Sequence, residues 1–334
     1  MSDTFAGPLD GRLHRLFPQS STSFLRLKSM KIVVTGGAGF IGSHIADAYV
    51  KEGHEVVVID NLATGFRRNI NPRAKFYEAD IRDREAMDRI FRTERPSAVN
   101  HHAAVAAIVE SLRDPIPTFQ ANLLGTVNVL MALGSRGKGT RKFIFASSGA
   151  VYGTPKHIPA KESEPTSPES PYGLSKALGE DIIRFYAGQY GFAYTLFRYP
   201  NVYGPRQNPK GEAGVTAIFG GLMKASKRPT IFGDGTKSRD YTFVEDIVGA
   251  NVAALHRGDG EVINLGWGET TTDQAIFDVI ARGTCFHGLP HYAPARKGEA
   301  YRIALNARKA KRVLGWAPKV KLEEGIMKTI ENLP

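Results

Sequence analysis

The chain has 334 residues, of which 42% are apolar and 10% aromatic, enough to bury one large core or the cores of two lobes. No run of eighteen or more apolar residues occurs, so we expect no membrane partner. The only cysteine, Cys285, excludes an intrachain disulfide, and no Cys or His pair has the spacing of a zinc site. The composition therefore favours a cytoplasmic protein whose chemistry uses no metal.

The formal net charge of +11 raises the question of nucleic-acid binding. Lys and Arg are interleaved with Asp and Glu along most of the chain, and only short basic clusters stand out, at Arg67-Arg68 and 309–312. Such clusters are typical of solvated faces. We expect no nucleic-acid partner, and the charge favours at most anionic substrates.

Residues 1–29 form a separate segment, because Pro8, Pro18 and a Ser/Thr-rich stretch at 19–23 interrupt every periodic pattern. We predict that this segment is a disordered N-terminal extension. It carries four basic residues against two acidic ones, which faintly resembles a transit peptide, but Met30 directly before the first predicted strand fits an upstream start equally well.

From Met30 onward, short apolar runs alternate with longer helical patterns, which is typical of a parallel sheet with helices on both faces. We predict strands at Lys31–Thr35, Glu55–Asp60, Lys75–Glu78, Ala98–His101, Lys142–Ala146, Tyr194–Arg198 and Val262–Leu265. Helical spacing predicts helices over 43–52, 84–93, 118–134 and 172–189. The predicted fold class is α/β, a doubly wound parallel sheet of the Rossmann type.

The pattern changes after about residue 204, where glycine and proline become more frequent and the regular alternation weakens. We therefore predict a dinucleotide-binding domain over 30–204 and a smaller C-terminal substrate-binding lobe over 205–334. Residues 236–265 are expected to return to the main sheet.

A glycine-rich loop follows the first predicted strand and opens a helix. Gly36 permits a tight turn, Gly39 lets the backbone approach a pyrophosphate, and Gly42 lets the helix pack close to the strand. Phe40 and Ile41 lie between the last two glycines, where free N–H groups of a helix N-terminus face the negative charge. The loop predicts a dinucleotide site.

The end of the second predicted strand indicates which dinucleotide binds. Asp60 and Asn61 lie there, and a carboxylate at this place accepts hydrogen bonds from the adenosine ribose and repels a 2′-phosphate. Arg67 and Arg68 could accommodate that phosphate, but an exposed loop explains them as well. We expect NAD rather than NADP.

Tyr172 and Lys176 lie four residues apart at the start of a predicted helix, so the phenol and the ammonium share one face. A phenol with a pKa of about 10 is a poor base at neutral pH, but a neighbouring ammonium and a positive nicotinamide both stabilise the phenolate. An ordinary amphipathic helix start explains the pair if it is taken alone. Together with the glycine loop, the pair predicts hydride chemistry at an alcohol.

Further motifs follow one another along the chain. They are Asp60-Asn61, Asp80-Ile81, 101–104, 122–126, 147–153, 198–206, Arg239-Asp240-Tyr241 and 314–316. With the Gly36-x-x-Gly39-x-x-Gly42 and Tyr172-x-x-x-Lys176 patterns, they make the chain resemble the extended short-chain dehydrogenase/reductases. Within these it resembles the UDP-glucose 4-epimerase group, from Met30 to the C-terminus.

The resemblance implies NAD as the cofactor and a role for several residues in holding it. It assigns Asp80 and Ile81 to the adenine, Ala103 and Ala104 to the cofactor backbone, Asn122 to the same site, and Tyr199 and Pro200 to the nicotinamide side. It also makes Ser148 the third catalytic residue, which bonds the reacting sugar hydroxyl and relays a proton to Tyr172. Capping the strand end is the alternative role of Ser148.

In the C-terminal half the resemblance implies a site for a UDP-sugar and a homodimer through the helices near 118–134 and 172–189. It assigns Asn201 to the diphosphate, Phe232 to the uracil, Arg239 and Arg296 to phosphate charge, and Glu299 to the uridine ribose. Ile303 stands where side-chain bulk limits the group on sugar C2, and an isoleucine leaves acceptance of N-acetyl sugars open.

The residues after Ser148 discriminate between the reactions that this fold supports. Dehydratases and related decarboxylases follow the catalytic Ser or Thr with an acidic residue, whereas this chain has Gly149 and Ala150. We therefore expect an isomerase that interconverts UDP-glucose and UDP-galactose through a 4-keto sugar. The alternatives are a UDP-glucuronate 4-epimerase, which needs a further cation for the C6 carboxylate, another nucleotide-sugar oxidoreductase, and a non-enzymatic NAD-binding regulator or RNA-associated protein.

Overall fold

The structure is a computed structural model that describes residues 29–134, 139–209, 214–296 and 300–333. The extension expected over 1–29 lies outside the described residues apart from Ser29, whose hydroxyl donates to the Gly53 carbonyl at 2.9 Å.

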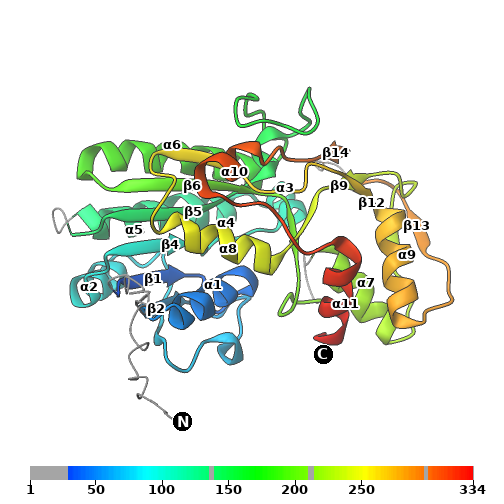
Figure 1. The fold of residues 1–334 in the computed structure, drawn as a ribbon, viewed down its shortest axis with the longest axis horizontal. Helices are drawn as coiled ribbons and strands as arrows, with labels where there is room; N and C mark the ends of the chain where they lie inside the picture. The colour runs from blue at the N-terminus through cyan, green and yellow to red at the C-terminus, as the bar shows by residue number, and fades with distance from the viewer. Residues whose placement is uncertain (1–28, 135–138, 210–213, 297–299, 334) are drawn as a thin grey trace, which may run out of the picture.

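Seven parallel strands form one sheet in the order β11-β6-β5-β4-β1-β2-β3 (Figure 1). They are β1 (Lys31–Thr35), β2 (Glu55–Asp60), β3 (Lys75–Glu78), β4 (Ala98–His101), β5 (Lys142–Ser148), β6 (Ala193–Tyr199) and β11 (Glu261–Asn264). Every predicted strand is present, and β5 continues two residues beyond the predicted end, to Ser148. The predicted doubly wound α/β fold is confirmed.

Helices cover both faces of this sheet because each has an apolar stripe that packs against it. One face carries α1 (Phe40–Lys51), α8 (Val244–Ala254) and α10 (Arg308–Leu314). The other carries α2 (Arg84–Glu94), α5 (Thr126–Gly134) and α6 (Pro171–Tyr190). The result is three layers, with the core divided between the two faces of the strands.

A third core lies beside the sheet, where α7, α9 and α11 gather at one end of the molecule (Figure 1). These helices are α7 (Val215–Lys224), α9 (Asp273–Thr284) and α11 (Leu322–Glu331). Small sheets lie beside these helices. Their strands are β7 (Asn201–Tyr203), β8 (Thr230–Phe232), β9 (Ser238–Arg239), β10 (Tyr241–Phe243), β12 (Thr271–Thr272), β13 (His291–Ala293) and β14 (Arg302–Ile303). Between β10 and β12 the chain returns to the main body, because α8 packs on α1 and β11 pairs with β6.

The helix predicted over 118–134 has three parts, namely α4 (Ile116–Phe119), a π-helical segment η2 (Gln120–Gly125) and α5. By length and mean hydropathy, Ile116–Gly134 could cross a membrane, but 44% of it is buried and it packs against α2 and α6. Shorter elements are η1 (Arg67–Asn69), α3 (Ile108–Arg113) and η3 (Gly149–Tyr152).

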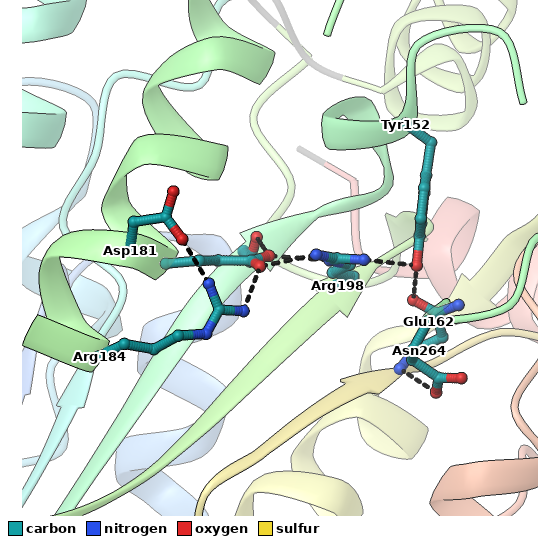
Figure 2. Close-up of polar contacts among 8 residues, drawn as sticks. Tyr152, Glu162, Asp181, Arg184, Arg198 and Asn264 are labelled. Carbon is teal, nitrogen blue, oxygen red and sulfur yellow. Dashed lines mark hydrogen bonds and ion pairs between the residues drawn. The ribbon is translucent and has the colours of Figure 1, made fainter. Parts of the chain in front are cut away.

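A buried ion pair fixes α6 against the sheet (Figure 2). Arg198 on β6 donates from Nε and Nη2 to both carboxylate oxygens of Glu180 on α6, at 2.9 and 2.7 Å. Both side chains are buried. The Ser147 hydroxyl donates to the same carboxylate at 2.6 Å. Because a bidentate pair fixes direction as well as distance, the axial position of α6 is set relative to β5 and β6.

The same guanidinium extends the contact across the sheet (Figure 2). Arg198 Nη1 donates to the Tyr152 hydroxyl at 2.8 Å, and that hydroxyl donates to Asn264 Oδ1 on β11, also at 2.8 Å. The backbone N–H of Asn264 donates to Glu162 at 2.9 Å. One buried charge is therefore connected to α6, η3 and the edge strand of the sheet.

Replacing Arg198 with Met would leave Glu180 buried without its bidentate partner, so we expect the free energy of unfolding to fall by about 3 kcal/mol. Urea unfolding measures the change. Arg184→Met is the matched control, because Arg184 reaches the same carboxylate at 3.2 Å but is 36% exposed, and its loss should cost under about 1 kcal/mol. Equal losses in the two variants would contradict this account.

Candidate active site

One continuous cavity of about 1280 Å³ runs from the glycine loop to the C-terminal lobe. It lies where β1 and β4 are neighbours and the strand order reverses, which is where open parallel sheets bind their ligands. All residues predicted for the site line this cavity, apart from Asn122 and from Glu299, which lies outside the described residues.

The glycine loop has no room for side chains. Gly36 has φ +71°, and a Cβ there would lie 2.6 Å from the backbone nitrogen of Ala103. A Cβ on Gly42 would lie 2.3 Å from the Gly36 carbonyl oxygen, and α1 begins directly after Gly39. The loop therefore brings bare backbone and the N-terminus of α1 to the cavity, an arrangement that suits a pyrophosphate.

The carboxylate of Asp60 is fixed at the end of β2. It accepts from the backbone N–H of Ala38 at 3.0 Å and of Leu62 at 2.8 Å. Asp60 is buried but lines the cavity, beside Phe40 and Ile41. A fixed anion at this edge fits ribose hydroxyls and disfavours a 2′-phosphate.

The carboxylate in the predicted adenine pocket, Asp80, is ion-paired with Arg82, which also lines the cavity. Hydrogen bonds from Arg82, followed by one from Asn61, hold the pKa of Asp80 at about 2 despite partial burial. Arg67, which raised the question of NADP, forms an ion pair with Glu78 at 2.6 Å and lies outside the residues that line the cavity. The residues present therefore fit NAD.

The reactive side chains meet in the middle of the cavity. Pro171 begins α6 and Ser170 caps it by accepting from the Gly173 N–H at 3.1 Å, which places Tyr172 and Lys176 on the turn facing β5. Ser148 ends β5, accepts from the Ala150 N–H at 3.1 Å and hydrogen-bonds the Tyr172 side chain. Ser148 thus caps η3, the alternative role considered from the sequence, and contacts the phenol, while its role in proton transfer stays a prediction.

The ionisation of the pair differs from the sequence-based expectation. Burial raises the pKa of Tyr172, and the hydrogen bond from Ser148 only partly opposes it. Burial also lowers the pKa of Lys176 to about 7, and its Nζ donates to the Ala146 carbonyl at 2.8 Å. The expected lowering of the Tyr172 pKa is therefore not a property of the protein alone, because both groups are desolvated.

Tyr199, predicted for the nicotinamide side, and Ala103 and Ala104, predicted for the cofactor backbone, line the same cavity. Tyr199 OH lies 3.0 Å from His102 Nε2 and accepts from the Asn251 amide at 2.8 Å. Burial, and then the nearby Lys176, lowers the pKa of His102 to about 3, so this imidazole is neutral. Tyr199 is held rigidly at the floor of the cavity.

The C-terminal end of the cavity carries the predicted substrate residues. Arg296 lies over the ring of Phe232, 3.6 Å from its centroid, and Arg239 Nη1 donates to the carbonyls of Ser238 and Tyr301. Asn201, Pro200 and Ile303 line the wall between them and Tyr172. Two guanidinium groups beside an aromatic ring suit a nucleoside diphosphate.

Three further residues support the site, two of them, Asn122 and Ser111, outside the residues that line the cavity and one, Asp240, at its edge. Asn122 was predicted to contact the cofactor. Its side-chain Oδ1 accepts from the Val105 N–H, and its Nδ2 donates to the Val105 carbonyl and to the Ser175 hydroxyl, the latter at 2.9 Å. Ser111, which the sequence did not indicate, accepts from the Tyr172 backbone N–H at 3.2 Å. Asp240 was visible only as part of a motif, with no role assigned.

The sequence matches a known family over most of its length. The family described as "NAD dependent epimerase/dehydratase family" matches residues 32–266. The chain belongs to this family. NAD is the cofactor named in the description of this family, and the glycine loop and Asp60 remain the residues predicted to bind it.

Solved structures of other members resemble the chain closely. A UDP-glucose 4-epimerase of Thermotoga maritima, determined with UDP-glucose, is 45% identical, with a TM-score of 0.88 over 91% of this chain and 98% of that one. One from Thermus thermophilus, in complex with NAD, is 41% identical, with a TM-score of 0.86 over 91% and 99%. A UDP-N-acetylglucosamine 4-epimerase from Methanobrevibacter ruminantium M1 is 31% identical, with a TM-score of 0.85 over 92% and 98%.

Gly42→Ala should reduce NAD affinity at least about tenfold, because the new Cβ would lie 2.3 Å from the Gly36 carbonyl oxygen and force the loop to shift. NAD retained after gel filtration and the rise of Tm on adding NAD measure the effect. Gly188→Ala is the control, since a Cβ there would meet no atom of a neighbouring element within 4 Å. An alanine at position 42 that keeps wild-type NAD content would refute the steric argument.

Proposed function

We propose that the protein is a UDP-sugar 4-epimerase that interconverts UDP-glucose and UDP-galactose. The observation that carries this proposal is one cavity joining the NAD site, the Ser148, Tyr172 and Lys176 cluster, and the Arg239 and Arg296 pair. Gly149 and Ala150 follow Ser148 on η3, so neither of these two positions supplies the carboxylate that an elimination needs. The similarity to UDP-glucose 4-epimerases supports the same reaction.

In the proposed mechanism, Tyr172 accepts the proton of the sugar C4 hydroxyl and later returns it, while Ser148 bonds that hydroxyl and relays the proton. NAD, when bound, supplies the hydride acceptor and donor for C4. Lys176 Nζ donates to the Ala146 carbonyl and lies 6.0 Å from the centroid of the Tyr172 ring, where its protonated form would stabilise the phenolate. Because burial raises the pKa of Tyr172, proton removal depends on positive charge in the filled site.

Epimerisation also requires the hexose to present both faces of C4 to the bound cofactor, because the configuration inverts only if the hydride returns to the opposite face. Arg239 and Arg296, the residues predicted for the diphosphate, line the substrate end, and Ile303 adds apolar surface to the same cavity. Contacts of this kind would hold the nucleotide firmly and leave the hexose free to turn. The same pattern favours a substrate whose sugar is neutral at C6.

Tyr172→Phe removes the proton acceptor, so we expect interconversion of UDP-galactose and UDP-glucose to fall about 10²- to 10⁴-fold while NAD stays bound. The assay follows both sugars without added reductant. Tyr186→Phe, the same change about four helical turns further along α6, is the matched control and should keep full activity. An active Tyr172→Phe variant would exclude Tyr172 as the base.

The wild-type protein should be tested in parallel with UDP-N-acetylgalactosamine and UDP-glucuronate. Conversion of UDP-galactose alone would support the proposal as stated. Conversion of the N-acetyl sugar as well would show that Ile303 leaves room at C2. Preferential conversion of UDP-glucuronate would instead favour the alternative glucuronate epimerase.

We also infer a cytoplasmic homodimer, formed through α4, η2 and α6. Leu174, Leu178 and Phe185 are exposed on α6 at spacings of four and seven residues, which places them on one stripe. Ile116 and Leu124 are 57% and 60% exposed on the neighbouring segment, which packs against α6. An apolar patch of this kind is typical of an interface between subunits. The free, exposed Cys285 is compatible with a reducing compartment.

Leu178→Glu places a charge within this stripe, so we expect the dimer to dissociate to monomers in light scattering. The matched control is Leu289→Glu, because Leu289 is 74% exposed but lies in the C-terminal lobe. A wild-type protein that is already monomeric, or a variant that remains dimeric, would contradict the inferred interface.

A further inference from the structure

Asp240 is a buried carboxylate for which the proposed mechanism has no use. It lies between β9 and β10, is 2% exposed and borders the substrate end of the cavity. Its Oδ1 accepts from the Trp267 N–H at 3.0 Å, and its Oδ2 accepts from the N–H groups of Gly268 at 2.9 Å and Leu305 at 3.2 Å. These donors come from two separate segments of the chain.

Burying this carboxylate is unfavourable by itself. Burial raises the pKa of Asp240 to about 6, the three backbone N–H groups oppose the shift, and Glu269 nearby adds to it. The carboxylate therefore begins to take up a proton as the pH falls below 7. The three N–H donors stabilise its ionised form. Because burial of a carboxylate is unfavourable, we expect Asp240 to have a role in positioning the segments that it joins.

The main chain of Asp240 connects directly to predicted substrate residues. The Asn201 N–H donates to the Asp240 carbonyl at 2.9 Å, and the Asp240 N–H donates to the Ile303 carbonyl at 3.0 Å. Arg239 precedes Asp240 and pairs with Ile303 in the register of β9 and β14. Asn201, Arg239 and Ile303 are therefore each bonded to Asp240 or adjacent to it.

The loop that donates to Asp240 fits closely around the carboxylate. A Cβ on Gly266 would lie only 2.4 Å from Asp240 Oδ2. The loop can approach the carboxylate because position 266 has no side chain. The packing leaves little freedom for Asp240 to shift relative to the 266–268 loop or to Leu305.

We propose that Asp240 is a positioning residue for the substrate half of the cavity. Its carboxylate draws the 266–268 loop and Leu305 together around β9, which fixes Asn201 and Arg239 for the diphosphate and Ile303 for the hexose. The inference rests on the proposed UDP-sugar site. The proposed role concerns substrate affinity. None of the residues that donate to the Asp240 carboxylate belongs to the glycine loop or to the Ser148, Tyr172 and Lys176 cluster.

Asp240→Asn tests this role, because the amide keeps the size of the carboxylate but turns one acceptor into an NH₂ group that meets a backbone N–H. We expect KM for UDP-galactose and Kd for UDP to rise about tenfold, with kcat and bound NAD within about twofold of wild type. A purely structural weakening would lower Tm without this separation of KM from kcat.

Asp246→Asn on α8 is the matched control. Asp246 is also buried, burial also raises its pKa, and it accepts from the Val320 N–H at 3.1 Å, but it does not line the cavity. This variant should lose stability and keep wild-type KM. If Asp240→Asn keeps wild-type KM and Kd, or if Asp246→Asn raises KM equally, the proposal is wrong.

Gly266→Ala provides a second route if Asp240→Asn does not fold, because its Cβ would displace the carboxylate while leaving its charge in place. The same rise in KM and in Kd for UDP is expected, and an unchanged Kd would overturn the proposal. Wild-type protein that binds UDP but does not interconvert UDP-galactose would refute the proposed function alone. The comparison of Kd for UDP among the variants would still decide the role of Asp240.

Discussion

The ion pair between Glu180 on α6 and Arg198 on β6 joins the two elements on which the chemistry depends. Tyr172 and Lys176 lie on the first turns of α6, and Tyr199 follows Arg198 directly, so one buried contact sets the distance between the proposed base and the floor of the cofactor site. Ser147 contributes to the same contact and precedes Ser148. If α6 shifted along its axis by a fraction of a turn, Tyr172 and Lys176 would both move relative to Ser148 and Tyr199.

The two ends of the cavity carry different charged groups. At the place predicted for the adenosine the carboxylate of Asp60 is held by backbone N–H groups and that of Asp80 is paired with Arg82, whereas guanidinium groups at Arg239 and Arg296 lie at the other end. Between them the buried Lys176 has a pKa of about 7, and His102 is neutral. The middle of the cavity is therefore weakly charged in the protein itself, which leaves its electrostatics to the molecules that fill it.

Local patterns made most of the fold predictable from the sequence. Buried parallel strands are continuous apolar runs, so the sheet was predicted correctly. A glycine loop between a strand and a helix predicts a dinucleotide site, and this loop lines the cavity. The partners of Asp240 and Glu180 lie far away in the chain, and no periodic pattern marks them. No sequence pattern indicated that Asn122, on the π-helical segment η2, would bond Val105 with its side-chain amide. The pKa of Tyr172 required knowledge of burial, and the division into lobes at 204 stays a prediction.

The path of the chain between the sheet and the C-terminal helices has a consequence for how the protein can be divided. The chain leaves the sheet after β6, returns with α8 and β11, leaves again for α9, returns with α10 and ends in α11 (Figure 1). No single cut can release either part as an intact polypeptide, since each contains segments from several stretches of sequence. For the same reason, a fragment ending after β6 would expose the face that α8 and α10 cover.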